Sequence, residues 1–266
     1  MIPLVLETIV RTLGTGSFRW VDDQPTDDDL DHIFKQTSDQ FDRLELKDSM
    51  LRDLRAGKAS LVTKSSEYAK VLAIVYPDTE IPWDMFAQIF TAFGKPSKPS
   101  RGSWRIVWFA HPSLRTRPDG TEPGPEHVNG GYTYACTNDT IVIYREEEVC
   151  RVLVHELLHA ACTDHEGLSE VDNEALTETW AELFLVGIQA KGSLQKAESL
   201  WKAQAQWIAD QEDVLRRENK VNDRQSYAWR YTVARRAVLH GFGITLPHPS
   251  ASPSVGTSMR FTHAGI

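Results

Sequence analysis

The fold is decided by the stretch Val154-His155-Glu156-Leu157-Leu158-His159-Ala160, an HExxH sequence inside an apolar run that is typical of a helix. An α-helix turns by about 100° per residue, so His155 and His159 project from the same face one turn apart. Two imidazoles in this arrangement can bind one metal ion, which makes half of a zinc site. Glu156 lies on the neighbouring flank, where it can reach a water on the metal without being a ligand, as a general base requires.

The residues that precede this stretch support the same interpretation. The segment Thr140-Ile141-Val142-Ile143-Tyr144 is a β-branched run that predicts a strand. Three acidic residues follow at Glu146, Glu147 and Glu148, where the dipole of a helix N-terminus favours negative charge. The sequence therefore predicts a strand that leads into the helix carrying the HExxH motif.

A third ligand is expected further along the chain, because a catalytic zinc usually takes three protein ligands and keeps its fourth position for water or substrate. The segment 173–184 is rich in helix formers and has an apolar stripe, so it predicts a second helix. Glu178 on this helix is our candidate ligand, and Glu174 and Glu182 share its face as lesser alternatives. Eighteen residues separate Glu178 from His159.

The chain resembles the gluzincin-type zinc metallopeptidases over residues 132–185, in its HExxH-x18-E spacing and in the local sequence Glu178-Thr-Trp-Ala-Glu182. The resemblance implies a Zn²⁺ cofactor held by the two histidines and Glu178. It also implies that an acid four residues after the ligand, here Glu182, orients a zinc-bound histidine. In this family a Tyr or His of a helical lobe donates a hydrogen bond to the oxyanion of the tetrahedral intermediate. The available donors are Tyr231, which we favour, Tyr227 and His240.

His165 is the rival ligand, because His155, His159 and His165 have the spacing of the metzincin motif HExxHxxGxxH. The glycine of that motif is replaced by Cys162, and a cysteine adopts the sharp backbone break of that position less readily than glycine does. The Met-turn of the metzincins is also missing, since Met259, in an irregular tail, is the single downstream methionine. These two departures favour Glu178 over His165.

The composition restricts the classes of protein to which the chain can belong. It has 266 residues, of which 41% are hydrophobic, enough to bury a core. A net charge of −8 argues against a nucleic-acid-binding surface. Three cysteines, Cys136, Cys150 and Cys162, show no framework spacing, so reduced thiols are expected. The opening Met1–Glu7 does not read as a signal peptide and no apolar stretch approaches membrane length, so a cytoplasmic or otherwise intracellular protein without a membrane partner is expected.

We expect an α+β fold with a zincin-like catalytic domain, whose upper lobe holds a small β-sheet and whose lower lobe is helical. An N-terminal helical region is expected over 1–94, the zincin-like domain over 95–246, and an extended or disordered tail over 247–266. The Pro, Ser and basic residues of 95–102 mark the boundary between the first two parts.

Periodicity and turn residues place the individual elements. The expected helices span 26–54 as one helix or a pair, about 66–75, from 82 onward, 194–217 and 226–240, the last of them ended by Gly241. The expected strands span 104–109, 132–136 and 140–144. The strand 132–136 is our candidate for the sheet edge that pairs with an extended substrate.

These features predict a zinc-dependent peptidase in which Glu156 is the general base for attack of a metal-activated water on a peptide or protein substrate. The Gly-x-Met-Glu-Asn segment of the family's aminopeptidases is absent from the sequence, which favours an endopeptidase. The alternative is a zincin-fold structural or interaction protein with little or no turnover. The presence of Glu156 argues against this alternative.

Overall fold

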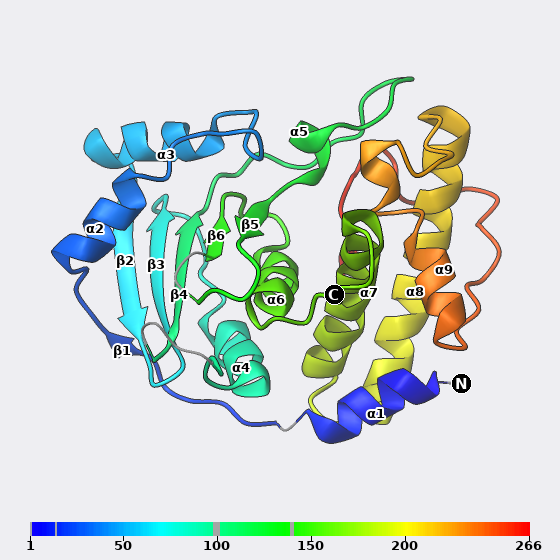
Figure 1. The fold of residues 1–266 in the computed structure, drawn as a ribbon, viewed down its shortest axis with the longest axis horizontal. Coiled ribbons are helices and arrows are strands. Elements are labelled where there is room, and N and C mark those ends of the chain that lie inside the picture. The colour runs from blue at the N-terminus through cyan, green and yellow to red at the C-terminus, as the bar shows by residue number, and fades with distance from the viewer. Residues whose placement is uncertain (1, 14, 98–101, 139–140) are drawn as a thin grey trace. The chain divides into compact units, whose positions relative to one another are not determined.

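The computed structural model describes residues 2–13, 15–97, 102–138 and 141–266 (Figure 1). The chain forms two compact units, and each unit is assembled from separate segments of the sequence. The sheet unit comprises Gly16–Leu114 and Asn129–Thr163. The helical unit comprises Met1–Thr15, Arg115–Val128 and Asp164–Ile266. The fold is therefore a mixed α/β fold whose units are discontinuous in sequence.

The sheet unit contains a six-stranded mixed sheet in the part of the chain that the structure describes, with strand order β1-β2-β3-β4-β6-β5. The strands are β1 Val21–Asp22, β2 Ser60–Ser65, β3 Ala69–Val75, β4 Trp104–Phe109, β5 Gly131–Thr133 and β6 Ile141–Ile143. The three central strands β3, β4 and β6 are parallel to one another, whereas β1, β2 and β5 join by antiparallel pairing. Nearly all residues of the central strands are buried, as expected for parallel strands covered on both faces.

Helices cover both faces of this sheet, and alternate residues of β4 show which helix lies on which face. Val107 and Phe109 belong to one core cluster with residues of α2 (Asp27–Phe34) and α3 (Leu46–Arg55). Between them, Trp108 contacts Phe86 of α4 (Trp83–Phe93), with ring centroids 6.0 Å apart. Successive side chains of a strand point to opposite faces. The second face therefore carries α4, together with α6 (Val149–Ala160), which contacts α4, β5 and β6.

The helical unit is built around α7 (Glu170–Ala190) and α8 (Leu194–Glu218). It also contains α1 (Leu4–Thr12), α5 (Pro125–Val128), the 3₁₀ helix η1 (Tyr227–Trp229) and α9 (Arg235–Gly241). A cluster of buried apolar residues joins α1, α7, α8 and α9. Gly187 allows α1 to lie close to α7, since a Cβ atom there would be 2.6 Å from Ile9 Cγ2. The small residue thus determines how closely these two helices pack.

Most of the expected elements are confirmed. The strands expected at 104–109, 132–136 and 140–144 correspond to β4, β5 and β6, although residues 139 and 140 lie outside the described residues. The segment 26–54 forms a helix pair, α2 and α3, and Thr26 caps α2 in a capping box with Asp29. The helices expected after Pro82, around the HExxH motif, around Glu178 and over 194–217 correspond to α4, α6, α7 and α8.

The helix expected at about 66–75 is wrong, because Ala69–Val75 forms strand β3. Its residues apart from Lys70 are buried, and the segment pairs with β2 on one side and β4 on the other. Because a segment rich in Val, Ile and Leu packs well in a buried sheet, it forms a strand here rather than a short helix. The first 94 residues therefore do not form a purely helical region. They contribute β1, β2 and β3 to the sheet that also contains β4, β5 and β6.

Two further expectations near the C-terminus also need correction. The single helix expected over 226–240 is instead η1 followed by turns and α9. The break falls at Tyr231, Thr232 and Val233, which have low helix propensity, and the Thr232 hydroxyl donates to the Ala228 carbonyl at 2.7 Å. The tail 247–266 is irregular but packed rather than disordered, with Met259 0% and Phe261 2% exposed.

The predicted linker 95–102 is described only in part, because residues 98–101 lie outside the described residues. Among the helices that the structure describes, none is both long and apolar enough to cross a membrane.

Candidate metal site

The HExxH motif lies on α6, a helix of the sheet unit that is buried on almost all sides. Leu153, Val154 and Leu157 are 0% exposed. Sheet residues of β5 and β6 contact the helix, and α4 packs beside it (Figure 1). A helix that is apolar around most of its circumference is stable only when it is enclosed in this way. The polar groups on α6 are therefore carried by a rigid, well-packed element.

His155 and His159 are brought together by the helical turn, as the sequence predicts. Their Nε2 atoms are 3.2 Å apart, and the rings are inclined by 72° with centroids 4.8 Å apart. Two imidazole nitrogens on one tetrahedral zinc, each at 2.0–2.1 Å, are about 3.3 Å apart. The observed separation therefore fits two ligands of one zinc ion. The same separation also fits an N–H···N hydrogen bond between the two rings.

Glu156 is held beside the edge strand β5. Its side chain is buried, and a Cβ atom added at Gly131 of β5 would lie 3.3 Å from Glu156 Oε1. The same added atom would be 2.7 Å from Val152 Cγ1 and 2.9 Å from the Val142 carbonyl oxygen. Gly131 therefore allows α6 to approach the sheet closely. The Glu156 carboxylate lies against the strand backbone as a result.

Strand β5 is at the edge of the sheet, as the sequence predicts for the region 132–136, although the strand itself spans Gly131–Thr133. Within the described residues it pairs with β6 on one side and no strand lies on its other side. The Tyr144 N–H donates to the Gly130 carbonyl, which marks that pair as hydrogen-bonded. Because pairs alternate along an antiparallel ladder, the backbone groups of Gly131 and Thr133 point away from β6.

The C-terminal end of α6 forms a Schellman motif in which cysteine takes the usual place of glycine. The Cys162 N–H donates to the His159 carbonyl at 3.0 Å, and the Thr163 N–H donates to the Leu158 carbonyl at 3.2 Å. Cys162 has a φ of 63°, in the left-handed region. Cysteine therefore does adopt here the conformation that we expected it to adopt less readily, at the position of the metzincin glycine.

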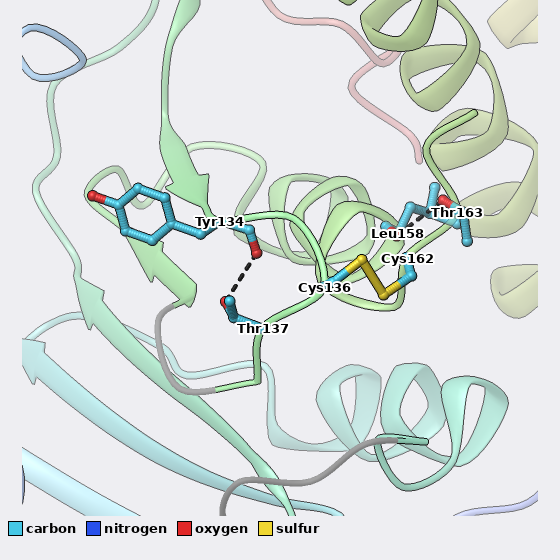
Figure 2. The surroundings of a disulfide bond; sticks show 6 residues. All are labelled: Tyr134, Cys136, Thr137, Leu158, Cys162 and Thr163. Atoms are coloured by element: carbon cyan, nitrogen blue, oxygen red, sulfur yellow. Dashed lines mark hydrogen bonds between the residues drawn. A yellow bond between two sulfur atoms is a disulfide. The ribbon is translucent and has the colours of Figure 1, made fainter. Parts of the chain in front are cut away.

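Cys136 and Cys162 form a disulfide, so the expectation of reduced thiols is wrong for these two residues (Figure 2). Their Cα atoms are 4.5 Å apart, a separation that a disulfide spans. The bond joins the chain after β5 to the end of α6. The Cys136 N–H also donates to the His159 carbonyl, at 3.1 Å. Cys150 remains a thiol, and burial raises its pKa to about 12.

The candidate carboxylate ligands lie on α7, in the helical unit. Glu174, Glu178 and Glu182 follow one another at intervals of one helical turn, and Glu178 is 2% exposed. The Glu182 carboxylate is buried and accepts a hydrogen bond from the Arg235 guanidinium, which also donates to Gln211 Oε1 at 2.7 Å. Glu182 is thus part of a buried ion pair, and its proposed contact with a zinc-bound histidine stays a prediction.

Tyr231 is partly buried in the same unit, and its hydroxyl is 3.4 Å from that of Tyr227. Burial, followed by the negative charge of Glu174 and by Tyr227, raises the pKa of Tyr231 well above its usual value. The phenol therefore stays protonated and able to donate a hydrogen bond at neutral and moderately alkaline pH. Its role as the oxyanion donor stays a prediction.

His165 is exposed and takes part in a local turn. Its Nδ1 accepts a hydrogen bond from the Gly167 N–H at 3.0 Å. The Asn173 side chain bonds both its backbone N–H and its carbonyl, at 2.9 and 3.1 Å. The Nδ1 atom of this rival ligand is thus already occupied within its own loop.

Sequence reasoning missed two features of the site. The contact of Gly131 with α6 had a signal in the pair Gly130-Gly131 directly ahead of the expected strand, because a glycine next to a strand allows another backbone or helix to approach closely. The Cys136–Cys162 bond was signalled by a cysteine three residues after His159 and another just after the edge strand. The odd number of cysteines obscured it.

Comparisons of the chain with protein-family models, with curated proteins and with solved structures found no match.

Replacing Gly131 with alanine should destabilise the protein by about 1–3 kcal/mol, because the new methyl group overlaps Val152 and the Val142 carbonyl in a closely packed region. Urea unfolding followed by circular dichroism measures this change. Gly241→Ala on α9 is the matched control, since no atom lies within 4 Å of an added Cβ there. Equal stability of the two variants would show that α6 does not need a glycine at position 131.

Proposed function

We propose that the protein is a zinc-dependent peptidase whose metal is held by His155, His159 and a carboxylate of α7. The observation that carries this proposal is the His155–His159 pair, whose Nε2 atoms are 3.2 Å apart on a buried helix with Glu156 beside them. His155 and Glu156 are buried, and His159 is partly buried. Polar side chains at such positions of an apolar helix are costly, so their presence in one motif favours a functional site. The fold belongs, in this proposal, to the zincin-like group.

Glu178 is the third ligand in this proposal, on the strength of its spacing from His159 and the resemblance to gluzincins. The Glu182 carboxylate is in an ion pair with Arg235, which makes Glu182 a weaker candidate for binding the metal directly. Glu174 lies one turn before Glu178 on the same helix and is the alternative. A set of two imidazoles and one carboxylate suits zinc and leaves one position for water or substrate.

When bound in such a site, zinc lowers the pKa of a coordinated water and polarises a carbonyl group. The protein's own contribution is the Glu156 carboxylate, which accepts the proton of the attacking water and then passes it to the leaving amine. Packing against Gly131 restricts the positions that this carboxylate can take. The proton acceptor is thereby oriented before the substrate binds, which is what general-base catalysis requires.

An extended peptide is the substrate class that suits the edge strand. Strand β5 is at the edge of the described sheet, and the backbone groups of Gly131 point away from β6, so an extended peptide would pair along this side of β5. Side chains of a paired peptide alternate between the two faces of the sheet. Those on the Tyr132 face would meet a polar cavity of about 340 Å³, lined by His32, Lys35, Gln36, Thr37, Asp39, Tyr132 and Tyr134. An internal peptide segment suits this geometry, so we propose an endopeptidase.

Tyr231 completes the proposed chemistry as the donor to the oxyanion that forms from the attacked carbonyl. A donor must carry its proton at the working pH, and the raised pKa of this phenol satisfies that condition.

The zinc content of purified variants tests the ligand assignment. The parent should bind one zinc per chain by elemental analysis, and His159→Ala should lose most of it because a single remaining imidazole on α6 binds zinc weakly. Glu178→Ala should also release zinc, whereas Glu174→Ala and His165→Ala should retain it. If Glu178→Ala retains zinc and Glu174→Ala loses it, the third ligand is Glu174 rather than Glu178. Unchanged zinc in His159→Ala would overturn the site.

Glu156→Gln tests the chemistry separately from the metal. The amide keeps the shape of the side chain but cannot accept a proton, so peptide cleavage should fall by about 10²–10⁴-fold while zinc content stays the same. A library of internally quenched peptides, assayed with parent and variant at equal zinc loading, measures this change. Equal cleavage rates would contradict the role of Glu156. Absence of cleavage by the zinc-loaded parent would favour the structural or interaction protein instead.

A further inference from the structure

We propose that Cys136 and Cys162 form a thiol–disulfide exchange site whose oxidised state holds the His159 end of α6 in place. The starting observation is the position of the bond, which closes between the chain after β5 and the residue that follows the helix (Figure 2). The consequence for zinc binding rests on the proposed function. The local effect on the helix end does not.

The geometry of the helix end explains why a covalent bond matters at this point. Cys162 occupies the position of the Schellman motif that glycine usually takes, with a φ of 63°. A residue with a Cβ atom disfavours this left-handed conformation. Cys136, the other half of the bond, has a φ of 61° and is in the same region. The disulfide therefore holds two residues in conformations that neither would strongly favour alone.

Both ends of the bond also converge on one ligand residue. The His159 carbonyl accepts hydrogen bonds from the N–H groups of Cys162 and Cys136, at 3.0 and 3.1 Å. The Thr163 hydroxyl donates to the Leu158 carbonyl at 2.9 Å, which closes the same turn (Figure 2). Breaking the sulfur–sulfur bond frees the Cys136 segment from this turn. The last turn of α6, which carries His159, then has fewer constraints.

The pair is accessible to small thiols, since Cys136 and Cys162 are both exposed residues. The thiolate of a small thiol such as glutathione attacks one sulfur, releases the other cysteine as a thiolate and leaves a mixed disulfide. A second thiol then displaces the remaining cysteine. One protein disulfide and two small thiols thus become two protein thiols and one small disulfide. Glutathione disulfide reverses the reaction. Cys150 does not compete, because burial raises the pKa of its thiol to about 12.

Hydrogen exchange of metal-free protein tests the local effect. Oxidised protein, prepared with glutathione disulfide, should show the Cys136–Cys162 linkage by peptide mapping. Reduction should speed exchange of the Cys162 and Thr163 amides by about tenfold, because the left-handed conformation is disfavoured for cysteine without the bond. The amides of α8 serve as the internal control. Absence of the linkage after oxidation, or equal exchange in the two states, overturns the proposal.

Two variants separate the role of the bond from that of the residues. Cys136→Ser combined with Cys162→Gly should keep the slow exchange without any disulfide, because glycine accepts the left-handed conformation. Cys136→Ser combined with Cys162→Ala should exchange like the reduced parent. Equal exchange in these two variants would contradict the role of the left-handed conformation at position 162. If either variant fails to fold, the comparison of the oxidised and reduced parent still tests the proposal.

Zinc affinity, measured by chelator competition on the same samples, tests the consequence for the metal. The reduced parent should bind zinc about tenfold to a hundredfold more weakly, the range seen when groups that support a ligand are removed. Equal affinity in both states overturns the link to the metal. If neither state binds zinc while exchange still differs, the proposed function fails and the exchange site stands.

Discussion

The close packing of α6 against the β5–β6 edge of the sheet is the constraint on which the rest of the sheet unit depends. It is possible because position 131 has no side chain, so Val152 and Glu156 of the helix approach the strand backbone. This contact encloses an apolar helix and fixes the direction in which its polar residues point. The placement of Glu156 against an edge strand follows from this helix–strand interface, whereas the helical turn itself brings the two histidines together.

The end of the same helix depends on a different kind of constraint. Many helices end in a left-handed residue that is usually glycine, and in α6 a cysteine takes that place. The cost of this conformation is offset by a covalent bond to Cys136 and by two hydrogen bonds to the His159 carbonyl. The stability of the last turn of α6 is therefore coupled to the oxidation state of two cysteines, one turn from a candidate metal ligand.

The sequence predicted what depends on short-range patterns. The spacing of His155 and His159 predicted their proximity, and apolar periodicity predicted α6, α7 and α8. The predictions from the sequence were wrong where residues distant in sequence determine the local conformation. Residues 69–75 were predicted to be helical, yet burial between β2 and β4 makes them a strand. Cys136 and Cys162 lie in two turns that are 26 residues apart in the sequence, and no short-range pattern predicts that these turns meet. The proposed third ligand, Glu178, is inferred from its spacing from His159 and from the resemblance to gluzincins.

Zinc-edge X-ray absorption of the zinc-loaded oxidised protein shows whether the two histidines of α6 bind the metal. We expect two imidazole nitrogens at about 2.0–2.1 Å from the zinc, and oxygen as the other atoms bound to it. We expect no sulfur, because Cys136 and Cys162 are bonded to each other and the pKa of the partly buried Cys150 thiol is raised to about 12. A spectrum with sulfur at about 2.3 Å, or without imidazole scattering, would show that His155 and His159 do not hold the zinc as proposed.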